Sequence, residues 1–231
     1  MPKLRIFVVN LDKAKDRWEH YKDDERFTRW SATDYNDLND NHPIFKDMVS
    51  YWNIDPKEHR AKCGCYLSHT NVYRYIIQNH LYNTLILEDD AELVGEIPED
   101  LPQDGFTYLA GSTSNLKLTS GPKKVEFEDG INPIKHNEYR MLCCLAIYIP
   151  NPRVALKMLQ ACEKMEGRRP RAVDTMLRDA MISQYVSYPA TFIERPNESQ
   201  IRSNKKDFCN SKYERVSAKR VLQEIKERIT E

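Results

Sequence analysis

The chain has 231 residues, and its 35 Lys and Arg residues balance 35 Asp and Glu residues, so the formal net charge is zero. A chain of this length is typical of one domain with a sizeable core. Zero net charge provides no overall attraction for nucleic acid or for an anionic membrane surface. We therefore expect a single α/β domain, no nucleic-acid partner, and a local site for any charged ligand.

The apolar run near the N-terminus, residues 4–10, is shorter than the apolar core of a secretory signal peptide. No later stretch reaches the roughly 18 apolar residues that span a bilayer. These features predict a cytoplasmic protein without a membrane span. The six cysteines are then expected to be buried thiols, and the spacing of Cys63 and Cys65 is not that of an ordinary structural zinc site.

The first part of the chain alternates between strand-like and helix-like patterns. Its predicted elements are a strand at 4–10, a helix from Asp12 through residue 24, a strand at 26–32, a loop with short helices at 34–60, a helix at 64–80 and a strand at 83–90. The last of these strands has the apolar run Leu85-Ile86-Leu87 at its centre, which is typical of a strand buried on both faces of a parallel sheet.

The second part continues the alternation as far as a charged tail. We predict a strand at 105–112, turns and a hairpin at 113–138, a central strand at 139–150, helices at 152–165 and 172–183, and a strand at 185–194. Residues 1–204 are predicted to form the main domain, and residues 205–231 an amphipathic C-terminal helix. This helix is expected to dock on the domain; the alternatives are contact with a partner, including another copy of the chain, and a role at a membrane surface.

Strands that alternate with helices predict a doubly wound, mostly parallel sheet of the Rossmann-like kind. Ligands bind such sheets at the carboxyl ends of the strands. Three consecutive acids, Glu88, Asp89 and Asp90, follow the buried strand at one of these ends. They are therefore the first candidates for a functional site.

Three adjacent carboxylates repel one another unless a cation or solvent compensates their charge. Mn²⁺ and Mg²⁺ prefer oxygen ligands and bind one or two carboxylates together with substrate phosphates. If the strand continues through residue 90, Glu88 and Asp90 share one face of it. Two alternatives remain open at this point: a strand end that runs into solvent, and the two-metal site of a nuclease.

Several short motifs occur along the chain in a characteristic order. They are Asn10-Leu11-Asp12 with Arg17, Trp30-Ser31-Ala32, Gly64-Cys65-x-Leu67-Ser68-His69, the acids at 88–90, Val173-Asp174, Tyr188-Pro189 and Ser199-Gln200-Ile201. In this order and spacing the chain resembles glycosyltransferase family 25. That family includes bacterial lipooligosaccharide galactosyltransferases and procollagen galactosyltransferases, and the resemblance extends from about residue 4 to residue 202.

The resemblance implies a GT-A type fold and an inverting, metal-dependent transfer of a hexose from a UDP-sugar to a hydroxyl group. UDP-galactose is the expected donor, with UDP-glucose as the next candidate. The acceptor is open among a glycan, a lipid-linked sugar and a hydroxylated peptide. The rival hypothesis is a non-catalytic relative that binds a nucleotide or a glycan, or that acts as an assembly subunit through its charged tail.

The resemblance also implies roles for particular residues. Asp90 and Glu88 are the expected ligands of Mn²⁺ or Mg²⁺, and Asp174 is the candidate base, with a helix-terminal acid as its alternative. The expected substrate-binding residues are Asn10, Leu11, Arg17, Ala32, Ser68, His69 and Asp89. Further candidates for a metal or phosphate contact are His136, Glu194 and Arg202.

Overall fold

The computed structural model describes residues 3–38, 56–110, 127–134, 144–165, 173–178 and 182–195. Its strands are β1 (Arg5–Asn10), β2 (Phe27–Ser31), β3 (Thr84–Glu88), β4 (Ala91–Leu93), β5 (Phe106–Tyr108), β6 (Gly130–Ile134), β7 (Ala146–Ile149), β8 (Gln184–Tyr188) and β9 (Phe192–Glu194). Its helices are α1 (Lys15–Trp18), the short 3-10 helix η1 (Tyr35–Asp37), α3 (Pro56–Gln78), α4 (Pro152–Met165) and α5 (Val173–Arg178). The predicted helix in 205–231 and the candidates His136 and Arg202 lie outside the described residues.

Seven strands form the central sheet in the order β2-β1-β3-β7-β5-β8-β6. Strand β1 is parallel to β2 and β3, and β5 is parallel to β8, whereas β7 is antiparallel to both β3 and β5. Strand β6 is antiparallel to β8 at the edge of the sheet. Five of the seven strands therefore point the same way, and the sheet is mixed rather than uniformly parallel.

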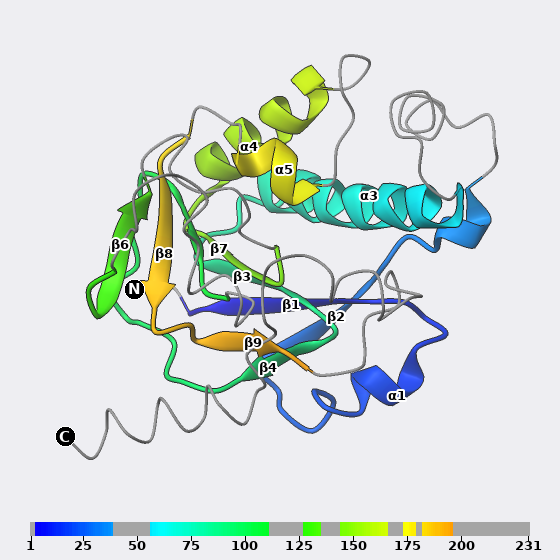
Figure 1. Cartoon of the computed structure of the whole chain (residues 1–231), viewed down its shortest axis with the longest axis horizontal. Helices are drawn as coiled ribbons and strands as arrows, with labels where there is room; N and C mark the ends of the chain where they lie inside the picture. Colours follow the sequence, from blue (N-terminus) through cyan, green and yellow to red (C-terminus); the bar gives the residue numbers. More distant parts are fainter. Residues whose placement is uncertain are drawn as a thin grey trace, which may run out of the picture.

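Alternate residues of the central strands face two separate cores. Phe7 on β1 and Ile86 on β3 belong to the core covered by α3, α4 and α5, which lie together on one face of the sheet (Figure 1). Ile6 and Leu85 face the opposite way, into a second core. That core is covered by Tyr21, which follows α1, and by Phe192 of the small sheet that β4 and β9 form. Helices thus cover one face of the sheet, and a β-ribbon and a short helical turn cover the other.

Helix α3 is longer than its sequence pattern predicts. It begins at Pro56, within the segment expected to be a loop, and runs to Gln78. Proline is favoured at the first position of a helix because its fixed φ suits the helix and its missing N–H would be unpaired there anyway. Ala61 and Cys63, which precede the apolar stripe predicted after Gly64, are also buried and extend the core contacts of the helix toward its N-terminus.

Two other predicted elements are shorter or divided. The helix expected from Asp12 is a single turn, Lys15–Trp18, and Asp12 does not cap it: Asp12 pairs with Arg29 and accepts a hydrogen bond from Ser31 Oγ at 2.8 Å. The strand expected at 185–194 is divided into β8 and β9, which belong to different sheets. Pro189 lies in the break, where a residue without an N–H cannot extend a strand ladder.

Candidate functional site

A cleft of about 110 Å³ opens at the carboxyl ends of β1, β2 and β3, beside the middle of α3. Of the residues that the sequence predicts for the site, those lining this cleft are Leu11, Arg17, Ala32, Ser68, His69, Glu88, Asp89 and Asp90. Residues between 11 and 90 thus meet here because three parallel strands end at one edge of the sheet. Asn10 and Asp174 are not among the lining residues, and their positions are described below.

The strand ends at Glu88, and Asp89 and Asp90 form a turn before β4 begins at Ala91. The sequence left open whether the strand would continue through residue 90. Because the backbone turns instead, the strict alternation of faces does not apply to the three acids. Each of them consequently has a different environment.

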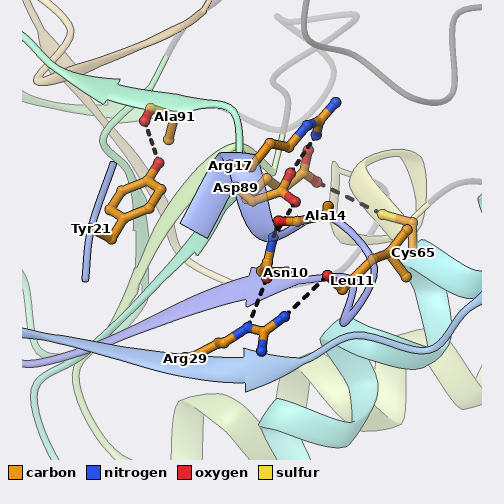
Figure 2. A network of polar contacts seen from close by, with 10 residues as sticks. Asn10, Leu11, Ala14, Arg17, Tyr21, Arg29, Cys65, Asp89 and Ala91 are labelled. Atoms are coloured by element: carbon orange, nitrogen blue, oxygen red, sulfur yellow. Dashed lines mark hydrogen bonds and ion pairs between the residues drawn. The ribbon is translucent and has the colours of Figure 1, made fainter. Parts of the chain in front are cut away.

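Asp89 is held by two residues from the first strand and the turn after it (Figure 2). Arg17 Nη1 donates to Asp89 Oδ1 at 2.5 Å, and Asn10 Nδ2 donates to Asp89 Oδ2 at 2.8 Å. The exposed fractions of the Arg17 and Asp89 side chains are 9% and 11%. Both carboxylate oxygens therefore have protein partners, and this geometry lets Asp89 position the turn that carries Asp90.

Asn10 is fully buried, and its amide group joins three segments of the chain. Its Nδ2 also donates to the carbonyl oxygen of Ala14 at 3.0 Å, and its Oδ1 accepts from Arg29 Nε at 2.8 Å. Arg29 in turn donates to the carbonyl oxygen of Leu11 at 3.2 Å (Figure 2). Asn10 thus fixes the loop after β1, and it acts on the cleft through Asp89.

Asp90 is buried among other acids, with 7% of its surface exposed. The pKa of its carboxyl is raised to about 8, first by burial and then by the charges of Glu88, Glu194 and Asp89, while Arg17 opposes the shift. Its Oδ1 has no hydrogen-bond partner among the described residues. A buried carboxylate with an unpartnered oxygen, crowded by like charges, is an environment that a divalent cation would stabilise.

Glu88 lies against two residues of α3. His69 Nε2 is 3.3 Å from Glu88 Oε1, and Cys65 Sγ is 3.7 Å from the same oxygen. The His69 side chain is 1% exposed, whereas that of Glu88 is 31% exposed. The sequence-based list of site residues did not include Cys65, although Cys65 is part of the Gly-Cys-x-Leu-Ser-His motif; its position one helical turn before His69 was the available signal.

Cys65 does not have the environment of a reactive thiolate. Burial raises the pKa of its thiol well above the usual range, and the charges of Glu88, Asp174 and Asp90 raise it further. With no cation beside it, a thiol in such surroundings stays protonated at neutral pH and is a poor nucleophile. Asp174, whose charge contributes to this shift, lies in the first turn of α5.

Ser68 and Gly64 hold α3 close to the segment after β2. Ser68 Oγ donates to the carbonyl oxygen of Gly64 at 2.7 Å and accepts from the backbone N–H of Thr33 at 2.9 Å. A Cβ atom at Gly64 would lie 2.8 Å from the carbonyl oxygen of Thr33. This close approach places Thr33 and Tyr35 on the wall of the cleft, where the sequence analysis did not predict them.

The residue after the acids is anchored from the other side of the sheet. The hydroxyl of Tyr21 donates to the carbonyl oxygen of Ala91 (Figure 2). The backbone N–H of Arg195 donates to the carbonyl oxygen of Asp90 at 2.8 Å, and the Arg195 guanidinium lies 5.1 Å from the centre of the Tyr21 ring. Hydrogen bonds to the backbone carbonyl oxygens of Asp90 and Ala91 therefore hold the acidic turn in place.

Two sets of side chains could hold a cation. Asp90 and Glu88 offer the oxygen ligands that Mn²⁺ and Mg²⁺ prefer, and the unpartnered Oδ1 of Asp90 fits such a role. Among the described residues, the three-ligand cluster is Cys65, His69 and Glu88, whose ligand atoms all lie within 4.8 Å of one another. Glu88 belongs to both sets.

Within the described part of the chain, no helix is both long and apolar enough to cross a membrane. The predicted absence of a membrane span agrees with this finding for those residues.

The sequence model of glycosyltransferase family 25, described as an LPS biosynthesis protein family, matches residues 3–177. The chain is also similar to procollagen galactosyltransferase 2 of Mus musculus, with 31% identity over 102 residues. That similarity covers 37% of this chain and 15% of the mouse protein, so the chain corresponds to a small part of that relative. The family match includes every residue that lines the cleft, from Val9 to Asp90. The chain belongs to glycosyltransferase family 25.

Proposed function

We propose that the protein is a metal-dependent, inverting glycosyltransferase that moves galactose from UDP-galactose to a hydroxyl group. The observation that carries this proposal is the turn of acids at the mouth of the cleft, in which Asp90 is buried with an unpartnered oxygen. Family membership supports glycosyl transfer, and the name of the mouse relative supports galactose over glucose. UDP-glucose is the alternative donor.

Asp90 and Glu88 would hold Mn²⁺ or Mg²⁺ beside the diphosphate of the donor. When bound, the cation supplies a positive charge that stabilises the diphosphate as it leaves. Asn10 and Arg17 keep Asp89 in place, and Asp89 keeps the turn of Asp90 in place. Leu11, Ala32, Ser68 and His69 line the space in which the donor would lie.

The proposed reaction is a single displacement at the anomeric carbon. The acceptor hydroxyl oxygen forms a bond to this carbon while the bond to the UDP oxygen breaks, and the electron pair of that bond leaves with UDP. The acceptor proton passes to a carboxylate base, for which we propose Asp174. Attack opposite the leaving group inverts the anomeric configuration.

The acceptor is a molecule with a free hydroxyl group, and three classes are proposed. A glycan or a lipid-linked sugar accords with the description of the family as LPS biosynthesis proteins. A hydroxylated peptide accords with the name of the mouse procollagen galactosyltransferase. An acceptor array with representatives of all three, read by mass spectrometry with UDP-galactose and UDP-glucose in parallel, distinguishes among them.

The first experiment measures thermal unfolding with UDP and Mn²⁺ together and separately, followed by sugar transfer from each donor. A ligand at a hundred times its Kd stabilises the folded state by ~2.7 kcal/mol, which raises Tm by about 5–11 °C for a domain of this size. We expect Asp90→Asn to stay folded and to lose roughly a hundredfold or more of the transfer rate.

The matched control is Glu92→Gln, because Glu92 is an exposed acid two residues further along the same turn and strand. This variant should keep both the UDP–Mn²⁺ stabilisation and the transfer rate. Stabilisation without transfer to any acceptor class would favour the non-catalytic relative instead. No stabilisation by any nucleoside diphosphate with metal would overturn the proposed function altogether.

A further inference from the structure

Three side chains of different chemistry converge at the inner wall of the cleft. Cys65 and His69 are one helical turn apart on α3, so they project from the same face of the helix. Glu88, at the end of β3, faces them from the sheet. One ligand atom from each residue lies within 4.8 Å of the other two, and all three residues line the cleft.

The distances from Glu88 to its two neighbours are close to those between ligands of one tetrahedral metal ion. Zinc–ligand bonds of about 2.0–2.3 Å at a tetrahedral angle place two ligand atoms about 3.3–3.6 Å apart. His69 Nε2 and Glu88 Oε1 are 3.3 Å apart, and Cys65 Sγ and Glu88 Oε1 are 3.7 Å apart. The first of these separations is long for an N–H···O hydrogen bond, whose usual length is about 2.9–3.0 Å.

The ligand types determine which ion would bind. Magnesium takes oxygen ligands and needs a near-octahedral shell, whereas thiolate and imidazole favour zinc and similar transition metals. Three protein ligands also leave a fourth position, as in catalytic rather than structural zinc sites. Since all three residues line the cleft, that position is open to water or to an oxyanion.

We propose that Cys65, His69 and Glu88 form a zinc site with an open fourth position at the cleft. Coordination replaces the thiol proton of Cys65, which is released to solvent. The Cys63-x-Cys65 spacing is not that of an ordinary structural zinc site. The proposed ligands do not depend on that spacing, because they come from one turn of α3 and from a distant strand rather than from a pair of neighbouring cysteines.

This inference goes beyond the proposed glycosyl transfer and is tested without donor or acceptor. The metal-free protein, prepared by chelation, is titrated with Zn²⁺ against a chromophoric competitor, and separately with Mn²⁺. We expect one Zn²⁺ per chain, bound more tightly than Mn²⁺. With Co²⁺ in place of Zn²⁺, we expect the near-ultraviolet absorption of a thiolate-to-cobalt charge transfer.

Two substitutions test whether the proposed ligands, rather than other thiols of the chain, bind the metal. Cys65→Ser should abolish the charge-transfer absorption and weaken Zn²⁺ binding by roughly a hundredfold or more. Glu88→Gln should weaken binding and keep the absorption, because the thiolate remains. Cys63→Ser is the matched control, since Cys63 lies on the same helix but is buried in the core under it. This control should keep both signals.

Each result decides for or against the site. Unchanged Zn²⁺ affinity and Co²⁺ absorption in folded Cys65→Ser would overturn the proposal, and so would Zn²⁺ binding no tighter than Mn²⁺ binding in the unsubstituted protein. Circular dichroism shows whether Cys65→Ser is folded; if it is not, Cys65→Ala and Glu88→Gln provide the same comparison. Because no sugar nucleotide is present, these results are independent of whether transfer occurs.

Discussion

The Arg17–Asp89 ion pair is a buried contact that holds the acidic turn. Both side chains are nearly inaccessible to solvent, and Asp89 receives its other hydrogen bond from buried Asn10. Removing one partner of a buried pair leaves a charge that water cannot reach. The pair therefore matters to stability as well as to the shape of the cleft.

We predict that Arg17→Met lowers the free energy of unfolding by about 3–5 kcal/mol. The measurement is urea denaturation followed by circular dichroism. Arg26→Met is the matched control, because Arg26 pairs with Asp24 on the protein surface, where solvent screens the interaction. Its unfolding midpoint should not change. Equal effects of the two substitutions would contradict a structural role for the buried pair.

The raised pKa of Asp90 predicts a pH dependence of stability in metal-free protein. In the unfolded chain this carboxyl loses its proton near its ordinary pKa of 3.8, whereas the folded protein keeps it up to about pH 8. Between these values the folded state binds more protons than the unfolded state, so this contribution to stability falls as pH rises. Above about pH 8 it falls no further.

Asp90→Asn removes this dependence and should be more stable than the unsubstituted protein at pH 8. The difference between the two proteins should grow from pH 4 to pH 8 by an amount on the order of a few kcal/mol. Urea denaturation across this range, with a chelator present, measures it. Parallel stability curves would show that Asp90 titrates normally in the folded protein.

At the scale of elements, the contact between α3 and the segment after β2 shapes one wall of the cleft. Gly64 permits this contact, since its position leaves no room for a side chain beside the Thr33 carbonyl oxygen. Alanine in a helix is ordinarily more favourable than glycine by ~1 kcal/mol. Here the steric effect opposes the helical preference and should outweigh it.

We predict that Gly64→Ala destabilises the protein by about 1–3 kcal/mol, as overpacking in a closely packed interior does. Gly95→Ala is the control, because a Cβ atom there would have its nearest neighbour, the Thr191 Cα atom, at an ordinary distance of 3.8 Å. That variant should unfold at an unchanged or slightly higher denaturant concentration. A stabilised Gly64→Ala protein would show that the helix and the segment are not closely packed.

At the scale of the whole molecule, the fold brings α5 to the same side of the sheet as α3. Asp174 lies in the first turn of α5, more than eighty residues after the acidic turn, and its charge acts on Cys65 in the cleft. The proposed base thus comes from the second half of the chain, and the proposed metal ligands come from the first. With this arrangement, a substitution of the proposed base should affect proton removal without affecting donor binding.

Asp174→Asn should therefore keep UDP–Mn²⁺ binding and lose most of the transfer rate, by roughly a hundredfold or more for a general base. Thermal shift measures the binding, and mass spectrometry measures the transfer. Glu163→Gln, on the exposed surface of α4, is the control and should transfer sugar normally. Normal transfer by Asp174→Asn would eliminate this residue as the base.

The pattern of apolar residues was sufficient to predict much of the fold. The strands β1, β2 and β3, the helix α4 and the central position of β7 all follow from local periodicity. The antiparallel direction of β7 does not, because a fully apolar strand has the same pattern in either direction. The division into β8 and β9 depends on which sheet each half joins, and that is decided by distant partners.

By itself, the sequence determined which residues to consider at the site. The order and spacing of the motifs predicted the acids at 88–90 and the residues around them, because both can be read directly along the chain. Only the tertiary structure decided what each acid contacts. Asp89 is bound by Arg17 across 72 positions of sequence, Asp90 is buried without a partner for its Oδ1 among the described residues, and Glu88 faces Cys65 and His69. These differences arise because β3 ends where the loop after β1 and the middle of α3 lie side by side. The spacing of residues along the chain does not show that these three segments are neighbours in the fold.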